Sequence, residues 1–267
     1  MDNTVTKVII GIIVVFFIAK TCGRDKNTGS SVAETWQKSP VDQLIKDLNA
    51  ESNFSIVLFD MDADEGSISS DNYRHQYQII IERPDTVLEQ KTDWKNVSEA
   101  FFSQNINNMG MEIVSKKDGV ITKQAVPAGY NHYVGNEKYG RWENRGGSSF
   151  WAFYGQYAFM SSMFNMMSYR RSYWNDYRTG GYYGSSRGYY GPRGSSPVYG
   201  TKSYAGSNAG RSTKWGSKPS TFKDKVRSRV SRSSSSSYRR KTSSRTTRSS
   251  SRYRRTSTRS RSGGFGK

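Results

Sequence analysis

The sequence predicts an α+β protein: a small antiparallel sheet with two helices on one face, then an aromatic and methionine-rich segment and a disordered basic tail. Between 39 and 126, helix-like and strand-like segments follow in the order helix, hairpin, helix, hairpin, which is typical of helices packed on one side of an antiparallel sheet. Residues 127–178 are rich in aromatic residues and methionine. Residues 179–267 are rich in Gly, Tyr, Ser and Arg, and we expect them to be disordered because they cannot bury enough apolar area to offset the entropy of ordering.

Two segments carry helix signals. The first is 39–48, where Ser39 is a favourable N-cap and Pro40 suits the first helical position. Its apolar residues have the i, i+3, i+4, i+7 spacing of one helix face: Val41, Leu44, Ile45 and Leu48. The second is 93–106, with Asp93 as the expected cap. Its inward-facing residues are expected to be Trp94, Val97 and Phe101, with Phe102 as a further candidate.

Four segments carry strand signals, and they form two hairpins. The first hairpin pairs 53–61 with 73–81 across an acidic turn, and the second pairs 111–115 with 120–123 across a Lys-Asp-Gly turn. Within 73–81, large and polar residues alternate, so one face should be buried and the other mostly wet. The buried positions are expected to be Tyr73, His75, Tyr77, Ile79 and Ile81.

A run of twelve uncharged, mostly apolar residues, 8–19, lies between Lys7 and Lys20. As a helix it covers roughly 18 Å, short of the ~30 Å hydrocarbon core, and its length suits the apolar region of an export signal. The first interpretation is a bacterial lipoprotein signal cleaved before Cys22, whose thiol is then acylated. The other two are an uncleaved transmembrane anchor and a buried core helix.

On the first two interpretations, residues 1–22 are a lipoprotein signal or membrane anchor. The polar, Gly- and Ser-containing stretch 23–38 then forms a flexible tether to the α+β domain, which we place at 39–126. Either form of attachment predicts a membrane-associated protein, and the lipoprotein signal places it in the bacterial cell envelope.

Charge is distributed unevenly along the 267 residues. The formal net charge is +19, and 34% of the residues are hydrophobic. Up to residue 144 there are fifteen Lys and Arg against twenty Asp and Glu, whereas from Arg145 onward there are twenty-six against two. Such an asymmetry indicates an anionic partner for the C-terminal half.

Residues 146–169 form a stretch of twenty-four residues without a charge, flanked by Arg145, Arg170 and Arg171. One interpretation is a membrane-surface segment, because Trp and Tyr favour the interface. A second is a further membrane span, and a third is packing against the α+β domain. The residues that would contact the membrane interface are Phe150, Trp151, Phe153, Tyr154, Tyr157 and Phe159.

The tail from 220 to 267 holds sixteen basic residues and one acidic residue. Its expected partners are anionic lipids or other envelope polyanions, with nucleic acid as the alternative, since phosphates of either kind attract such a segment. We expect the main polyanion-binding residues to be Arg239, Arg240, Lys241, Arg252, Arg254, Arg255, Arg259 and Arg261.

Motifs for catalysis or metal binding are weak. The acidic residues from Asp60 to Asp71 approach the spacing of a calcium loop, but Glu65 occupies the sixth position, where that loop needs glycine. The two histidines, His75 and His132, have neither metal-ligand spacing nor a nucleophile motif around them. The sequence therefore predicts a non-enzymatic protein with no metal and no cofactor.

The C-terminal half also carries a resemblance. A Ser-Phe-Trp motif at 149–151 leads into a methionine-rich run, and Ser-Pro-Val-Tyr-Gly at 196–200, a Ser/Thr/Arg tail and Gly-Gly-Phe-Gly at 263–266 follow. This half is similar to a family of uncharacterised enterobacterial envelope lipoproteins, which begin with an acylated-cysteine signal. The resemblance implies lipidation at Cys22 and no particular activity.

Together these features predict a membrane-tethered envelope protein whose cationic tail binds anionic surfaces, with a membrane-anchored nucleic-acid-binding protein as the alternative.

Overall fold

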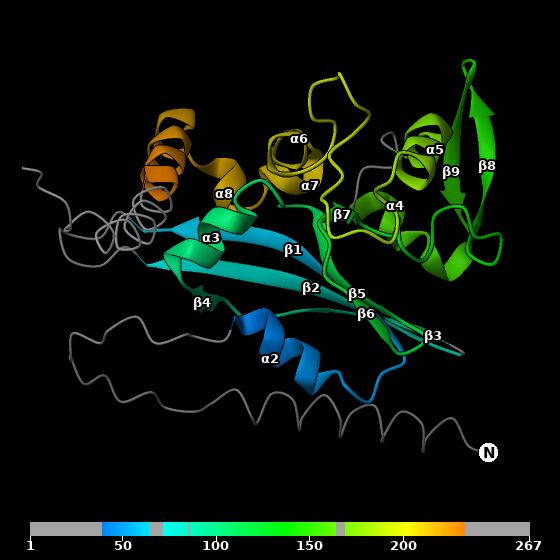
Figure 1. Ribbon diagram of the computed structural model, residues 1–267, viewed down its shortest axis with the longest axis horizontal. Helices are drawn as coiled ribbons and strands as arrows, with labels where there is room; N and C mark the ends of the chain where they lie inside the picture. The colour runs from blue at the N-terminus through cyan, green and yellow to red at the C-terminus, as the bar shows by residue number, and fades with distance from the viewer. Residues whose placement is uncertain (1–38, 65–71, 85, 164–168, 233–267) are drawn as a thin grey trace, which may run out of the picture. The chain divides into compact units, whose positions relative to one another are not determined.

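The computed structural model describes residues 39–64, 72–84, 86–163 and 169–232. An antiparallel sheet of seven strands lies at its centre, and its main path runs in the order β3-β2-β1-β5-β6, with β4 beside β2 and β7 beside β5 (Figure 1). The strands are β1 Asn53–Ala63, β2 Tyr73–Arg83, β3 Thr86–Lys91, β4 Lys95–Val97, β5 Met111–Lys117, β6 Val120–Thr122 and β7 Val126–Pro127. The predicted α+β class is confirmed.

Both predicted hairpins form. β1 pairs with β2, and β5 pairs with β6 through a turn in which Asp118 and Gly119 both have positive φ, 48° and 83°. Positive φ at both central residues is the geometry of a tight two-residue hairpin turn, and the Asp-Gly sequence favours it. The strand β3 was not expected, because its residues are largely exposed at an edge of the sheet and have no strong alternation.

The first helix, α2 (Pro40–Asp47), agrees with the prediction. The Ser39 side chain accepts a hydrogen bond from the Asp42 backbone N–H, which satisfies one of the free donors at the helix start. Val41, Leu44 and Leu48 are buried in a core on one face of the sheet.

The second helix, α3 (Glu99–Asn105), begins later than predicted. Its N-cap is Ser98, whose hydroxyl accepts a hydrogen bond from the Phe101 N–H. The expected start at Asp93 is wrong because residues 95–97 form β4, which pairs with β2 around Arg74. A β-branched Val97 suits a strand, so pairing with β2 overrides the helical spacing. Phe102 is buried in the same core as α2.

The second face of the sheet is covered as well, which corrects the prediction that it is mostly wet. Val57 and Ile80 point into a second core. Residues 126–199 supply most of that core, and its aromatic members are largely tyrosines. The buried aromatic residues of this core are Tyr130, Tyr133, Tyr139, Trp151, Tyr157, Tyr169, Tyr177, Tyr189 and Tyr199.

The uncharged stretch from 146 to 169 contributes to this second layer. It contains β9 (Ser148–Phe153), which pairs with β8 (Gly140–Arg145), then the 3-10 turn η1 (Gly155–Tyr157) and the short helix α4 (Phe159–Met163). Across the ranges given above, no helix is long and apolar enough to cross a bilayer. The prediction of a transmembrane helix is therefore wrong for this stretch, because strand pairing and core packing divide it into short elements. The anchor predicted for residues 1–22 lies outside the described residues.

The chain from 179 to 232 is folded, which corrects the prediction of disorder for that part. The helices are α5 (Arg171–Thr179), α6 (Thr201–Gly206), α7 (Asn208–Arg211) and α8 (Lys214–Ser217), and residues 220–232 are also helical. We call 220–232 the basic helix. It buries Val226 and Val230 in the α2–α3 core, with Phe222 packed against it. The i, i+4, i+8 spacing of these three residues was the sequence signal for a buried helix face. The tail beyond residue 232 lies outside the described residues.

We predict that Trp215→Ala lowers the free energy of unfolding by about 3–5 kcal/mol, because the Trp215 side chain is 0% exposed and packs against Phe102 and Phe222. Urea-induced unfolding measures the change. Val120→Ala is the control, since Val120 is 68% exposed and its truncation should shift stability by no more than ~0.5 kcal/mol. If the two variants were equally stable, the C-terminal segment would not belong to the core.

Candidate functional site

A β-bulge in β1 prepares the most distinctive polar cluster of the structure. The register of β1 against β2 shifts between Leu58 and Asp60. Side chains alternate along a strand, so without the shift Asp60 and Asp62 would point with Leu58 into the α2–α3 core. The extra residue instead puts Met61 in that core and turns both carboxylates away from it.

The outer half of β1 also has a free side. β5 pairs with β1 between Phe54 and Val57, and the following residues of β1 have α8 beside them instead of a strand. Asp60 Oδ2 accepts a hydrogen bond of 2.7 Å from the Lys214 N–H, and Asp60 Oδ1 accepts one of 3.1 Å from the Trp215 N–H. The carboxylate therefore satisfies the free donors at the start of α8.

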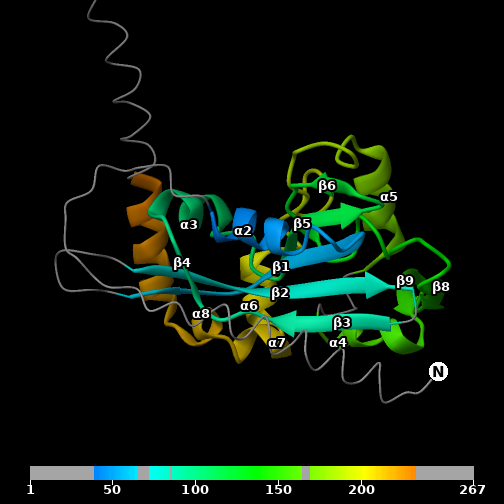
Figure 2. The ribbon, with the colours of Figure 1, turned by 90° about the horizontal axis from the view of Figure 1, so that it is seen from below.

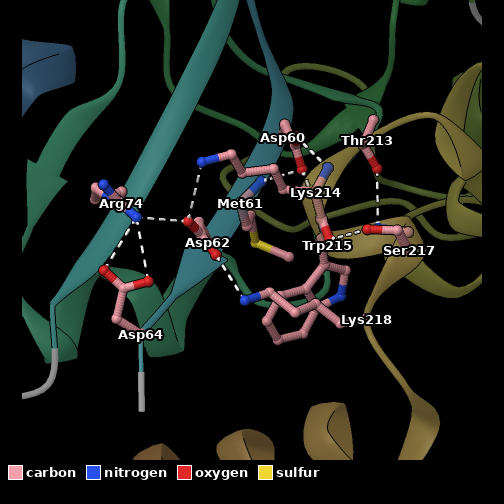
Figure 3. Close-up of polar contacts among 11 residues, drawn as sticks. Asp60, Met61, Asp62, Asp64, Arg74, Thr213, Lys214, Trp215, Ser217 and Lys218 are labelled. Carbon is pink, nitrogen blue, oxygen red and sulfur yellow. Dashed lines mark hydrogen bonds and ion pairs between the residues drawn. The ribbon is translucent and has the colours of Figure 1, made fainter. Parts of the chain in front are cut away.

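Asp62 forms the second half of the cluster (Figure 3). Its side chain is 3% exposed, and its Oδ2 lies 2.6 Å from Arg74 Nη2, the residue directly opposite on β2. Lys218 Nζ lies 3.2 Å from Asp62 Oδ1, and Lys214 Nζ lies 3.6 Å from Asp62 Oδ2. One buried carboxylate thus faces three cations. We call Asp60, Asp62, Arg74, Lys214 and Lys218 the acidic clasp.

The two carboxylates of the clasp titrate in opposite directions. Burial raises the pKa of Asp60 above its ordinary value of 3.8, although the N–H donors of Trp215, Lys214 and Met61 partly offset it. Burial also acts to raise the pKa of Asp62, but the ion pairs with Lys218, Arg74 and Lys214 outweigh it, and the pKa is lowered. Asp62 is therefore ionised at neutral pH and stabilises the fold there.

The clasp connects the sheet to the most basic part of the described chain. Lys214 is the first residue of α8, Lys218 follows its last residue, and the basic helix begins two residues after Lys218. Lys223 Nζ donates a hydrogen bond to the Gly216 carbonyl and Arg227 Nη1 donates one to Asn107 Oδ1, so the basic helix is held by polar contacts as well as by its buried valines.

The histidines fill structural positions. His75 is fully buried among Tyr77, Phe101 and Phe102, and burial lowers its pKa to about 3. Burial likewise lowers the pKa of His132 to about 4. Both rings are therefore neutral at pH 7.

The described residues of the stretch with calcium-loop spacing, Asp60 to Asp64, are engaged in hydrogen bonds and ion pairs. Asp60 and Asp62 belong to the clasp, and Asp64 makes an ion pair with Arg74 at 3.0 Å. Within the described part of the chain, no group of three or more His, Cys, Asp or Glu side chains has an arrangement that could hold a metal ion. Residues 65–71 of that loop lie outside it.

The predicted membrane-interface residues do not form one exposed face. Trp151 and Tyr157 are buried in the second core, which removes them from any membrane contact in this conformation. Phe150, Phe153 and Phe159 are half-buried. Tyr154 is 43% exposed. The reason is that these residues are divided among β9, η1, α4 and their connections instead of forming one helix with a single apolar stripe.

Two other predicted sites depend on residues outside the described ranges, and they stay predictions. One is lipidation at Cys22, and the other is the set of eight basic residues between 239 and 261. Comparisons with known protein families, with curated proteins and with solved structures found no match.

Sequence reasoning missed the clasp for two reasons. It placed Asp62 in a turn, whereas β1 continues through Ala63. It also had no local signal that Lys214 would return to β1, because the contact between Asp60 and Lys214 spans 154 positions.

We predict that Asp62→Asn lowers the free energy of unfolding at about pH 7 by about 1–3 kcal/mol, because it leaves three cations around a neutral amide. Because the pKa of Asp62 is lower in the folded state, ionised Asp62 stabilises the fold at pH values above its unfolded-state pKa. This stabilisation is lost as pH falls through the folded-state pKa. The difference in unfolding free energy between the wild type and Asp62→Asn should therefore be smaller at about pH 3 than at about pH 7. Chemical unfolding at both pH values measures it.

Asp60→Asn provides the matched comparison. The pKa of Asp60 is raised in the folded state, so ionisation of this carboxyl opposes folding as pH rises above 3.8. The loss of unfolding free energy caused by Asp60→Asn should therefore be larger at acid pH than at neutral pH, which is the opposite of the trend for Asp62→Asn. The same pH trend in both variants would contradict the assignment of opposite shifts.

Proposed function

We propose that this chain is a non-enzymatic protein that binds anionic surfaces through its basic C-terminal segment, residues 220–267. The observation that carries the proposal is the charge of this segment, sixteen basic residues against Asp224. Anionic lipid head groups attract each nearby Lys or Arg by about 1 kcal/mol, so a segment of this charge has ample affinity for such a surface. Anionic surfaces of a bacterial cell envelope are the setting that we propose for it.

The fold supports this proposal by the way it presents the start of the segment. The basic helix turns Val226 and Val230 into the core, while Lys225, Arg229 and Arg232 are exposed. The acidic clasp and the buried valines fix the position of the helix on the sheet. The described part of the basic segment is therefore firmly attached to the folded body.

The ion pairs of the clasp are compatible with a cationic surface. The three carboxylates of Asp60, Asp62 and Asp64 balance the charges of three cations, Arg74, Lys214 and Lys218. Lys214 is exposed to 53% in its side chain, and its ammonium group also lies 5.0 Å from the centre of the Trp94 ring. The clasp therefore adds no net negative charge next to the basic helix.

We predict that binding to vesicles containing anionic lipid weakens steeply between about 0.05 and 0.5 M salt, because screening shortens the range of the attraction to a few ångströms. Vesicle co-sedimentation measures the bound fraction, and neutral vesicles are the control. Salt-independent binding would contradict an electrostatic mechanism.

We also predict that deletion of residues 233–267 removes most of the affinity and leaves the fold intact. The deletion has to begin after 232, because Val230 is buried and removal of the basic helix would damage the core. A chain in which 233–267 is scrambled at constant composition is the matched control, and it should bind like the wild type. Loss of binding in the scrambled chain would mean sequence-specific recognition. Unfolding curves check that all chains remain folded.

A further inference from the structure

The helix α5 and its neighbouring loops lie at the opposite end of the sheet from the basic helix (Figures 1 and 2), and they hold a second group of arginines. Between 140 and 200 the sequence has seven arginines, no lysine and two acidic residues. Arg141 and Arg145 both pair with Glu143. The other five, in α5 and its flanking loops, make no ion pair with a carboxylate of the described chain, and each lies over an aromatic ring. They are Arg170, Arg171, Arg178, Arg187 and Arg193.

The tightest contacts are made after α5. The Arg178 guanidinium carbon lies 3.6 Å from the centre of the Tyr183 ring. Arg187 and Arg193 lie 4.7 Å and 5.8 Å from the centre of the Tyr182 ring. All three arginines are exposed, Tyr183 is 45% exposed, and Tyr182 is half-buried. We call these five residues the arginine–tyrosine platform.

The platform rests on buried groups. Tyr177 and Tyr189 are both fully buried and make edge contacts with Tyr183 and Tyr182, at ring-centre distances of 5.9 Å and 4.9 Å. The buried Gln124 side chain donates hydrogen bonds of 2.7 Å to the carbonyls of Tyr182 and Arg187, at the two ends of the loop. The rings are therefore fixed in place before any ligand arrives.

An arginine over a ring keeps N–H groups for a ligand, and of the three platform arginines Arg193 also donates a hydrogen bond of 3.2 Å from Nη2 to the Gly180 carbonyl. A guanidinium group that lies over a ring uses its face, while its N–H groups point outward in the plane and can bind a phosphate in bidentate fashion. An exposed ring beside such a group offers a surface on which a nucleobase stacks. A platform of this kind thus combines phosphate binding with base stacking within one short loop.

We propose that the arginine–tyrosine platform binds single-stranded nucleic acid. The strand would stack bases on Tyr183 and on the exposed part of Tyr182, with its phosphates on Arg178, Arg187 and Arg193. A single strand fits better than a duplex, because its bases are free to leave their neighbours and stack on protein rings. Binding to a lipid surface needs only positive charge, which lysine supplies as well as arginine. It does not need aromatic rings that are held in fixed positions.

The test uses the full chain, a labelled single-stranded oligothymidylate and about 0.5 M salt, at which long-range attraction to the basic tail is screened. We expect Tyr183→Ala to weaken binding roughly tenfold, since it removes one stacked base. Arg178→Lys keeps the charge but loses the planar group, so it should also weaken binding severalfold. Tyr183→Phe keeps the ring and should bind like the wild type.

Tyr154→Ala is the matched control, because Tyr154 is 43% exposed and no arginine of the described chain lies over it. It should leave the affinity unchanged. The proposal is overturned if the wild type does not bind at this salt concentration, if Tyr183→Ala and Arg178→Lys bind like the wild type, or if duplex DNA or anionic vesicles are held equally well. Deletion of 233–267 should leave this salt-resistant binding in place, which separates the platform from the function proposed for the tail.

Discussion

The bulge at Leu58–Asp60 in β1 is the feature on which the arrangement of α8 and the basic helix depends. It turns Asp60 and Asp62 out of the α2–α3 core, at the point where β1 has no strand neighbour on one side. Two carboxylates beside a free strand edge bind the start of α8 and the side chains of Lys214 and Lys218. Trp215 is thereby placed in the core, and the basic helix follows from that position.

Tyrosine explains how a chain with 34% hydrophobic residues and a mean hydropathy of −0.80 covers both faces of a sheet. A tyrosine ring buries a large area, and its hydroxyl needs a partner. In the second core, Tyr130 and Tyr199 share a hydrogen bond of 2.6 Å, and Tyr169 donates one to the Ala128 carbonyl. Polar composition therefore coexists with a packed interior, and Gly-Tyr-Tyr segments that look like low-complexity sequence contribute to it.

Positive charge occurs in two chemically different forms at the two ends of the sheet. Around the basic helix, lysines and arginines accompany serine, and the proposed attraction needs only charge. Around α5, arginine alone is used, and each guanidinium group that does not pair with Glu143 lies over an aromatic ring. The two proposals accordingly concern different ligands, an anionic surface for the tail and single-stranded nucleic acid for the arginine–tyrosine platform.

The sequence by itself determined the local elements: α2 with its Ser39 cap, the paired hairpins and the Asp-Gly turn, because caps, alternation and turn residues act over a few positions. It also determined the charge asymmetry on which the proposed function depends. The tertiary structure decided what depends on distant contacts. Pairing with β2 made a strand of residues 95–97, where helix was expected. Packing against the sheet ordered 179–232, and the β1 bulge joined Asp60 to Lys214 across 154 positions. No local pattern encodes such contacts, since their free energy appears only when the two segments meet.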